Sequence, residues 1–285
     1  MFNIKPEHLG GGTVLFRNVL DVPQDSLLKE LSSLKDEWRK ENFEIVYDDS
    51  GAPLHAVNKG GFIYDLDSMS KAPVRIQKLT NPFFKECDLA IYACLLEYIE
   101  IFPAILQCLW WRSTGHVLCY DEGASLGFHC DNDVNYRYGA IPSTEHATRN
   151  VLSALLYFND STEDDSVEHS FSGGHMTIPY FDIDITPRKG DVLLMPAGYL
   201  GAHEIHEVTR GSRYSYLSWF AQGSEDRDKG ICPMVPDEYY KNEGQWWLNT
   251  IIEDYESHLD SKYQNSDLIP QGKVSFKSRE KDHLK

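Results

Sequence analysis

The sequence GAHEIHEVTRGSRYSYLSWF, residues 201–220, contains the clearest strand and turn signals of the chain. Short runs of apolar and polar residues flank a Thr-Arg-Gly turn signal, a pattern typical of short β-strands separated by a turn. His203 and His206 lie in the first strand and Arg213 in the second. Strand alternation places the two histidines on opposite faces, so only one of them can point into a core.

Similar short apolar runs, separated by Gly, Pro, Asn and Asp, extend over residues 112–222. Strands this short with regular turn signals predict a β-sandwich or small barrel. Apolar residues recur at helical spacing from Gln24 to Asn42, and residues 81–101 form an apolar run that stops before Pro103. The first pattern predicts an amphipathic helix and the second a helix buried against the sheet.

We expect a single domain, because no linker or composition shift separates the pieces. A helical pattern returns after the β core, in PDEYYKNEGQWWLNTIIEDYESHLDSKY. The predicted fold class is mainly β with flanking helices. Its parts are a helical N-terminal support region at 1–111, the β core at 112–222, and a helical C-terminal extension with a basic tail at 223–285.

The amino-acid composition argues against membranes and nucleic acids as binding partners. Of the 285 residues, 41% are hydrophobic and 25% charged, as in ordinary globular proteins, and no apolar run approaches the ~20 residues of a membrane span. The start MFNIKPEHLGGG lacks the layout of a signal peptide. We therefore expect a cytoplasmic protein that does not bind membranes. The formal charge of −17 repels phosphate and argues against nucleic-acid binding, and the +3 tail GKVSFKSREKDHLK is interpreted as a solvated end.

A candidate metal motif stands in LGFHCDND, residues 126–133, where His129 and Asp131 are one residue apart. In a strand, positions i and i+2 project to one face and can reach one ion. His258 and Asp260 repeat the spacing, but in a helical pattern that turns them apart. On spacing alone, a metal site and an ordinary pair of polar residues remain equally open.

A distal histidine would complete a set of two histidines and one carboxylate. Such a set leaves three positions open and suits non-haem Fe(II), whereas zinc usually takes a fuller set of nitrogen or sulfur ligands. Arg213 is ten residues beyond His203 and seven beyond His206. An inward-facing arginine near an ion is costly unless it meets an anion, and its planar fork matches a carboxylate.

Several further features lie in a fixed order around these residues. The chain shows Tyr120-x-x-Gly123, His129-x-Asp131, LLYFN at 155–159, Gly173-Gly174, Pro187-Arg188-Lys189-Gly190-Asp191, then His203, Val208, Gly211, Arg213-Tyr214-Ser215 and Trp219. In this order and spacing, about 100 residues resemble the double-stranded β-helix (a jelly-roll, cupin-like core) of Fe(II)- and 2-oxoglutarate-dependent dioxygenases, in their prolyl 4-hydroxylase-like branch.

The resemblance implies roles for individual residues. It makes the three residues His129, Asp131 and His203 the catalytic iron ligands, with His203 preferred to His206 because the family's basic residue commonly follows the distal histidine by nine or ten positions. Arg213 would bind the far carboxylate of 2-oxoglutarate. The remaining implied contacts to 2-oxoglutarate are Ser215, Tyr120 and Tyr157, each tyrosine being equally open to a packing role, and the candidate substrate residues are Trp219, Tyr136 and Arg137.

The resemblance also implies a reaction. Fe(II), 2-oxoglutarate and O2 together oxidise an unactivated C–H bond, and because Asp131 is present hydroxylation is the expected outcome. The substrate stays open between a prolyl or other amino-acid residue of a peptide and a free amino acid or natural-product intermediate. A different class, a non-catalytic sensor that binds 2-oxoglutarate or a metal, is the second hypothesis. The sequence gives no oligomeric state.

Overall fold

The computed structural model describes residues 2, 4–59, 61, 63–109, 111–112, 115–132, 148–223 and 248–263. Its largest element is an eight-stranded sheet, the main sheet, in which all the described strand pairs are antiparallel and which contains strands from both halves of the chain. The strand order is β1 (Pro6–Gly10), β2 (Thr13–Phe16), β14 (Val192–Pro196), β10 (Thr148–Tyr157), β17 (Ser212–Gly223), β8 (His116–Asp121) and β6 (Val74–Ile76), with β7 (Trp111–Arg112) paired to β17.

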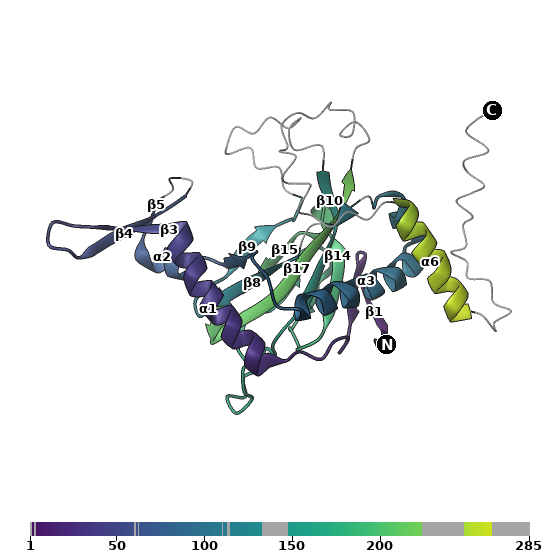
Figure 1. The fold of residues 1–285 in the computed structure, drawn as a ribbon, viewed down its shortest axis with the longest axis horizontal. Coiled ribbons are helices and arrows are strands. Elements are labelled where there is room, and N and C mark those ends of the chain that lie inside the picture. Colours follow the sequence, from purple (N-terminus) through teal and green to yellow (C-terminus); the bar gives the residue numbers. More distant parts are fainter. Residues whose placement is uncertain are drawn as a thin grey trace.

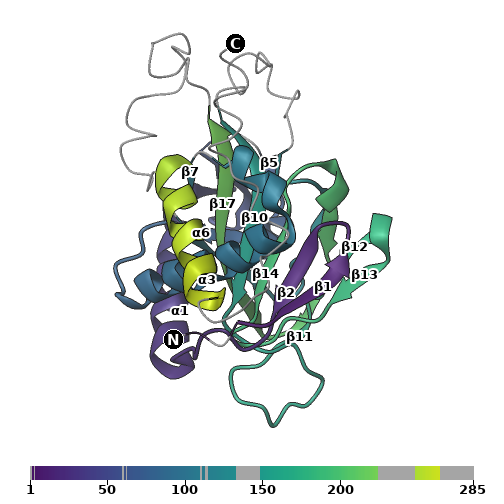
Figure 2. The same ribbon diagram turned by 90° about the vertical axis from the view of Figure 1, so that its right-hand side faces the viewer.

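A smaller sheet faces the main sheet, and the two together form the double-stranded β-helix (Figure 2). It carries the metal motif on its last strand. Its order is β13 (Ile183–Ile185), β12 (Met176–Ile178), β15 (His203–Ile205) and β9 (Leu126–His129), and β11 (Ser172–Gly173) pairs with β16 (Val208–Arg210) beside it. Short 3-10 turns occupy Pro103–Gln107, Pro179–Phe181 and Tyr199–Gly201.

Side chains alternate strictly across the main sheet. On β10, Leu152, Ala154 and Leu156 join the core under the helices, whereas Leu155 and Tyr157 join the core between the sheets. This period of two is the expected geometry of a strand buried on both faces. The core between the sheets is where the polar residues of the predicted site lie.

Helices cover the outer face of the main sheet (Figures 1 and 2). α1 (Gln24–Asn42) has the predicted ends, and α3 (Phe83–Ile101) begins two residues later than predicted. α6 (Leu248–Tyr263) packs along α3. The short helix α2 (Leu66–Lys71) accompanies a three-stranded sheet, β3 (Phe43–Tyr47), β4 (Pro53–Asn58) and β5 (Ile63–Tyr64), which extends away from the main body in Figure 1. None of the described helices is long and apolar enough to cross a membrane.

The N-terminal region at 1–111 is more than the helical support that the sequence predicts. It adds β1, β2 and β6 to the main sheet. The four residues of β2 are all buried, so the strand has no alternating pattern, and its conformation depends on pairing with β14, where Val192 lies opposite Phe16. Pairing over such a sequence distance is invisible to a local pattern.

Two other expectations concern chain segments around the core. The C-terminal helix is found at α6, while residues 224–247 and the basic tail lie outside the described residues. The five cysteines of the described part are free thiols, and burial raises the pKa of Cys87, Cys94 and Cys119.

The close packing at Gly173 requires glycine, since its φ is +72° and a Cβ atom would lie 2.2 Å from the Glu207 carbonyl oxygen.

Candidate metal centre

Two histidines and an aspartate converge where β9 and β15 meet. His129 ends β9 and lies opposite His203, the first residue of β15. The two ring centres are 4.4 Å apart, and His129 Nε2 is 3.6 Å from Asp131 Oδ1. One ligand atom from each residue can be chosen so that all three lie within 4.8 Å of one another. The predicted ligand residues are therefore brought together in a geometry that one ion can bridge.

Backbone carbonyls orient both imidazole rings. His129 Nδ1 is 2.8 Å from the carbonyl oxygen of Gly127, and His203 Nδ1 is 3.0 Å from that of Gly201. A carbonyl oxygen only accepts, so each Nδ1 carries the proton and donates it. The lone pair of each neutral ring then lies on Nε2, the atom available to a metal.

Asp131 is held in its ionised form. Its Oδ2 accepts a hydrogen bond of 2.5 Å from Ser153 Oγ. Burial raises the pKa of Asp131, but His129, the charge of His203, Ser153 and the Trp219 indole together lower it to about 2. Burial also lowers the pKa of His203. At neutral pH the site thus offers a carboxylate and a neutral imidazole, the forms that bind metals.

A second polar group lies deeper in the same core. Arg213 is fully buried, and among the described residues its Nε, Nη1 and Nη2 have no hydrogen-bond partner. The buried hydroxyl groups of Tyr157 and Ser215 likewise have no hydrogen-bond partner in the described part of the chain. Ser215 lies opposite Tyr157 in the β10–β17 pairing, and two residues from Arg213 on the same strand face. These donors form a ready site for a carboxylate.

Two tyrosine rings enclose this cation. The guanidinium carbon of Arg213 is 5.0 Å from the ring centre of Tyr120 and 5.4 Å from that of Tyr157. Burial raises the pKa of Tyr120 to about 12, against the opposing effect of Arg213. Both phenols therefore stay protonated donors at neutral pH. A buried cation without an anion is unfavourable by several kcal/mol, so the residues fit a group that brings a carboxylate.

One cavity of about 470 Å³ joins the metal cluster to Arg213. Its walls are mostly apolar, which excludes water and strengthens polar interactions within. Trp219, one of the candidate substrate residues, lines it, and its ring lies tilted against that of His116 with ring centres 5.0 Å apart. The apolar walls are formed by Pro73, Leu118, Leu126, Leu155, Met176, Ile205 and Leu217.

The cavity also contains a residue that sequence reasoning missed. Arg75, from β6, is one of its lining residues, with its guanidinium carbon 5.0 Å from the ring centre of Trp219. The only indication in the sequence is that Arg75 stands between two apolar residues, Val74 and Ile76, which are both buried in the structure. This alternation is typical of an edge strand. The predicted substrate residues Tyr136 and Arg137 lie outside the described residues.

His206 and His258, the other histidines considered as metal ligands, make contacts away from the metal cluster. The ring of His206 stacks on that of His175 at 3.9 Å and lies 3.1 Å from Thr177 Oγ1, on the outer face of the smaller sheet. His258, from the second His-x-Asp pair, is 3.4 Å from Glu97 on α3. Lys262 Nζ bonds both Glu97 and Glu100, so a lysine already neutralises that acidic pair.

Comparison with known proteins places this core in a family. A model described as the 2OG-Fe(II) oxygenase superfamily matches residues 115–221. This part of the chain, which holds the cluster and Arg213, therefore carries a domain of that superfamily, whose members use Fe(II) and 2-oxoglutarate. The flanking helices lie outside the matched segment.

Individual relatives agree with the family match. The chain is similar to a PKHD-type hydroxylase of Pseudomonas fluorescens, 29% identical over 42% of this chain and 43% of the relative, and to one of Acinetobacter baylyi, 33% identical over 35% and 39%. It thus spans about two fifths of the length of these curated relatives.

Two solved structures also resemble the chain. A prolyl hydroxylase of Trichoplax adhaerens in complex with a hypoxia inducible factor peptide fragment is 13% identical, covers 79% of this chain and 88% of its own, and has a TM-score of 0.46. A Pseudomonas putida prolyl-4-hydroxylase is 18% identical, covers 75% and 94%, and has a TM-score of 0.42.

Proposed function

We propose that the chain is an Fe(II)- and 2-oxoglutarate-dependent oxygenase that hydroxylates an unactivated C–H bond. The observation that carries this proposal is the pairing, in one cavity, of the three-residue cluster with a buried arginine that has no anion among the described residues. The first binds a ferrous ion and leaves positions open; the second binds a dicarboxylate.

Each residue has a proposed role in this reaction. His129, Asp131 and His203 hold the ion through two Nε2 atoms and one carboxylate oxygen. Arg213 and the Ser215 hydroxyl bind the far carboxylate of 2-oxoglutarate, while the Tyr120 and Tyr157 rings sandwich the guanidinium. Bound together, Fe(II), 2-oxoglutarate and O2 supply the oxidising chemistry. The protein's own part is to orient these groups and to keep water out with the apolar wall.

Two classes of substrate are proposed. We infer a prolyl or other amino-acid residue in a peptide, with a free amino acid or a natural-product intermediate as the alternative. Similarity to PKHD-type hydroxylases supports hydroxylation rather than another outcome. We further propose that residues 1–285 act as one domain, since β1, β2 and β6 complete the sheet that the matched core begins.

The test is O2-dependent conversion of 2-oxoglutarate to succinate by protein reconstituted anaerobically with Fe(II). We expect succinate from the wild type after O2 is admitted, even without a primary substrate, and none from Asp131→Ala. A wild type that binds 2-oxoglutarate but forms no succinate with O2 and any pool of peptides or metabolites would instead identify the non-catalytic sensor.

A further inference from the structure

Asp131, the carboxylate of the metal cluster, does not lie on the strand that carries His129. β9 ends at His129, and Asp131 follows in the turn after it. The β9–β15 pairing sets His129 opposite His203, but this pairing does not extend to the carboxylate. A residue in a turn is more mobile than a residue held between paired strands. Another part of the fold must therefore fix the position of Asp131.

Two side chains of β10 hold this residue. Asn150 Nδ2 donates a hydrogen bond of 3.0 Å to the backbone carbonyl oxygen of Asp131, and Ser153 Oγ donates one of 2.5 Å to Asp131 Oδ2. The first bond holds the backbone of the turn, and the second holds the end of the side chain. β10 is itself paired on both sides, with β14 and with β17. Asp131 is thus held at two points by an inner strand of the main sheet.

Ser153 is a polar residue on a strand face that otherwise packs in the core. Its side chain is fully buried, and it shares a face of β10 with Leu155 and Tyr157, which belong to the core between the sheets. Burial of a hydroxyl group is unfavourable unless the group is hydrogen-bonded. Because this hydroxyl donates to Asp131, we infer that the polar atom serves the carboxylate rather than the packing of the core.

The hydrogen bond from Ser153 makes the two carboxylate oxygens of Asp131 unequal. Oδ2 accepts from the serine, whereas Oδ1 is 3.6 Å from His129 Nε2, the nitrogen available to a metal. A carboxylate can bind an ion through one oxygen or through both. An oxygen that accepts a short hydrogen bond is a weaker ligand, because the proton draws on the electron pair that an ion would use. We therefore expect the metal to take Oδ1 alone.

The number of bound oxygens decides how many positions of the ion stay open. Two histidines and one carboxylate oxygen leave three open positions. A carboxylate that bound through both oxygens would take a fourth position and leave two. The proposed function needs the open positions for 2-oxoglutarate and O2, so a second oxygen of Asp131 would compete with them.

We propose that Asn150 and Ser153 are positioning residues of the metal centre. Asn150 fixes the turn that presents Asp131, and Ser153 restricts Asp131 to one metal-binding oxygen. This inference rests on the proposed function, because it assumes an ion held by His129, Asp131 and His203. Replacement of the groups that hydrogen-bond metal ligands typically lowers metal affinity or activity by about 10–100-fold.

Infrared spectroscopy measures how many oxygens of the carboxylate bind. Protein made with isotope-labelled aspartate is compared with and without Fe(II) under argon, so that only aspartates affected by the ion contribute to the difference. The antisymmetric and symmetric carboxylate stretches lie further apart when one oxygen binds than when both bind. We expect a wide separation in the wild type and in Ser153→Thr, which keeps a hydroxyl, and a narrow one in Ser153→Ala.

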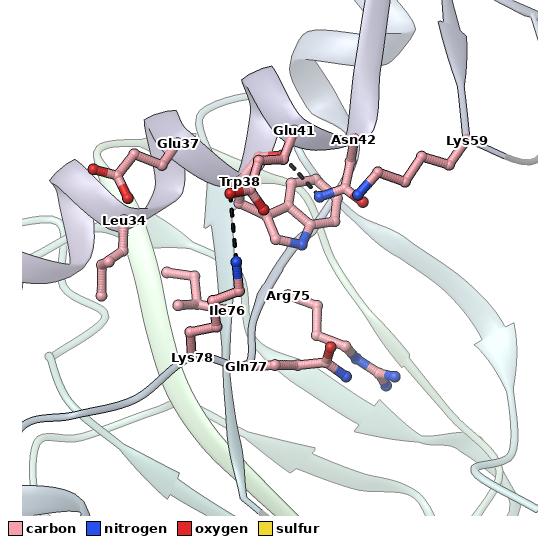
Figure 3. Close-up of a pocket in the computed structure, with 10 residues that line it drawn as sticks. All are labelled: Leu34, Glu37, Trp38, Glu41, Asn42, Lys59, Arg75, Ile76, Gln77 and Lys78. Carbon is pink, nitrogen blue, oxygen red and sulfur yellow. Dashed lines mark hydrogen bonds and ion pairs between the residues drawn. The ribbon is translucent and has the colours of Figure 1, made fainter. Parts of the chain in front are cut away.

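A second measurement, the affinity for Fe(II) under argon, tests Asn150. We expect Asn150→Ala to bind the ion about ten-fold more weakly than the wild type, because the turn that presents Asp131 is no longer fixed. The matched control is Asn42→Ala. Asn42 Nδ2 likewise donates to a backbone carbonyl, that of Trp38 at 2.8 Å, but in a cleft of about 280 Å³ between α1 and β6 (Figure 3). This variant should keep the wild-type affinity.

Ser172→Ala is the matched control for Ser153→Ala. It also removes a buried serine hydroxyl, whose hydrogen bond of 2.8 Å goes to the Thr162 carbonyl oxygen. Ser172 is not among the described residues that line the metal cavity. We expect the wide separation and the wild-type affinity in this variant, whereas a general loss of packing would affect both serine variants alike.

Three results would overturn the inference: a narrow separation in the wild type, a wide separation in Ser153→Ala, or a wild-type affinity in Asn150→Ala. Loss of the ion from Ser153→Ala would overturn it too, because the hydrogen bond would then be needed for binding itself rather than for the choice of oxygen. Succinate formation by the wild type separates these outcomes from failure of the proposed function. A wild type that forms succinate alongside any of them defeats the role of β10 alone, and a wild type that forms none defeats the oxygenase itself.

Discussion

Arg213 lies directly opposite Tyr120 in the β8–β17 pairing, and its guanidinium carbon is 5.0 Å from the centre of that ring. The arginine is fully buried, and its nitrogen atoms have no hydrogen-bond acceptor among the described residues. A cation in this position destabilises the ligand-free protein and becomes favourable when a carboxylate arrives. Burial of Arg213 therefore lowers the stability of the ligand-free protein and strengthens the binding of a carboxylate ligand.

Replacing this arginine should separate stability from binding. We expect Arg213→Met to weaken 2-oxoglutarate binding at least about 100-fold, because it removes the buried partner of a carboxylate. The ligand-free variant should be at least as stable as the wild type, since an apolar side chain of similar length replaces an unpaired buried charge. Calorimetric titration and thermal unfolding without ligand measure the two effects.

The matched control is Arg188→Met, which removes an exposed cation from a turn of the same core. It should bind 2-oxoglutarate as the wild type does. Equal loss of affinity in both variants would mean that the general field of the protein, not a contact from Arg213, governs binding.

Much of this site was predictable because its signals are local. His129 ends β9 and Asp131 follows in the turn after it, so the strand expected for both ends one residue before Cys130, but their closeness in the sequence still brings them together. The ends of α1 agree with the expectation because its apolar face repeats over 19 residues. The segment from His203 to Arg213 contains two short strands, β15 and β16, and reaches the start of β17. In each case the residues concerned lie within about twenty positions of one another in the sequence.

Arg75 was not predictable for the opposite reason. β6 has three residues, too few for a period, and it enters the site by pairing with residues 117–119, more than forty positions away. The 3.9 Å stacking of His206 on His175 likewise joins two strands that the sequence does not relate. Tertiary pairing, rather than local propensity, decides such positions.

Asp121 supplies a pH-dependent contribution to stability. It accepts from Lys35 at 2.8 Å and Ser212 at 2.6 Å and pairs with Arg39, which ties α1 to the main sheet. Burial raises the pKa of Asp121, but Lys35, Ser212 and Arg39 outweigh it and lower the pKa below 3.8. The folded-state pKa is thus depressed, so the ionised group stabilises the fold above the unfolded-state pKa, and this contribution is lost on further acidification.

We therefore expect Asp121→Asn to lower the free energy of unfolding at pH 7 by about 1–3 kcal/mol. The difference from the wild type should shrink as the pH falls below about 3.8. Denaturant titrations across this range measure it. Asp67→Asn, which breaks the exposed pair with Lys71, should change stability by less than about 0.5 kcal/mol. A pH-independent deficit in Asp121→Asn would rule out the electrostatic explanation.

A substitution at Gly173 tests whether the backbones of β11 and β16 lie as close together as the structure shows. An alanine there needs the left-handed φ of +72° and places Cβ 2.2 Å from the Glu207 carbonyl oxygen. We expect Gly173→Ala to destabilise the protein by about 2–3 kcal/mol, measured by denaturant unfolding. Gly198, with a φ of −82° and no atom within 4 Å of a built Cβ, should accept alanine with almost no change. Similar effects of both substitutions would contradict the packing at Gly173.

The stoichiometry of Fe(II) binding under anaerobic conditions in His203→Ala and His206→Ala shows which histidine is the distal metal ligand. The two histidines are three residues apart, but His203 is 4% exposed beside Asp131 whereas His206 stacks on His175 on the outer face. We predict one Fe(II) per chain for the wild type and for His206→Ala, and none for His203→Ala. Retention of the ion by His203→Ala together with its loss from His206→Ala would contradict the account.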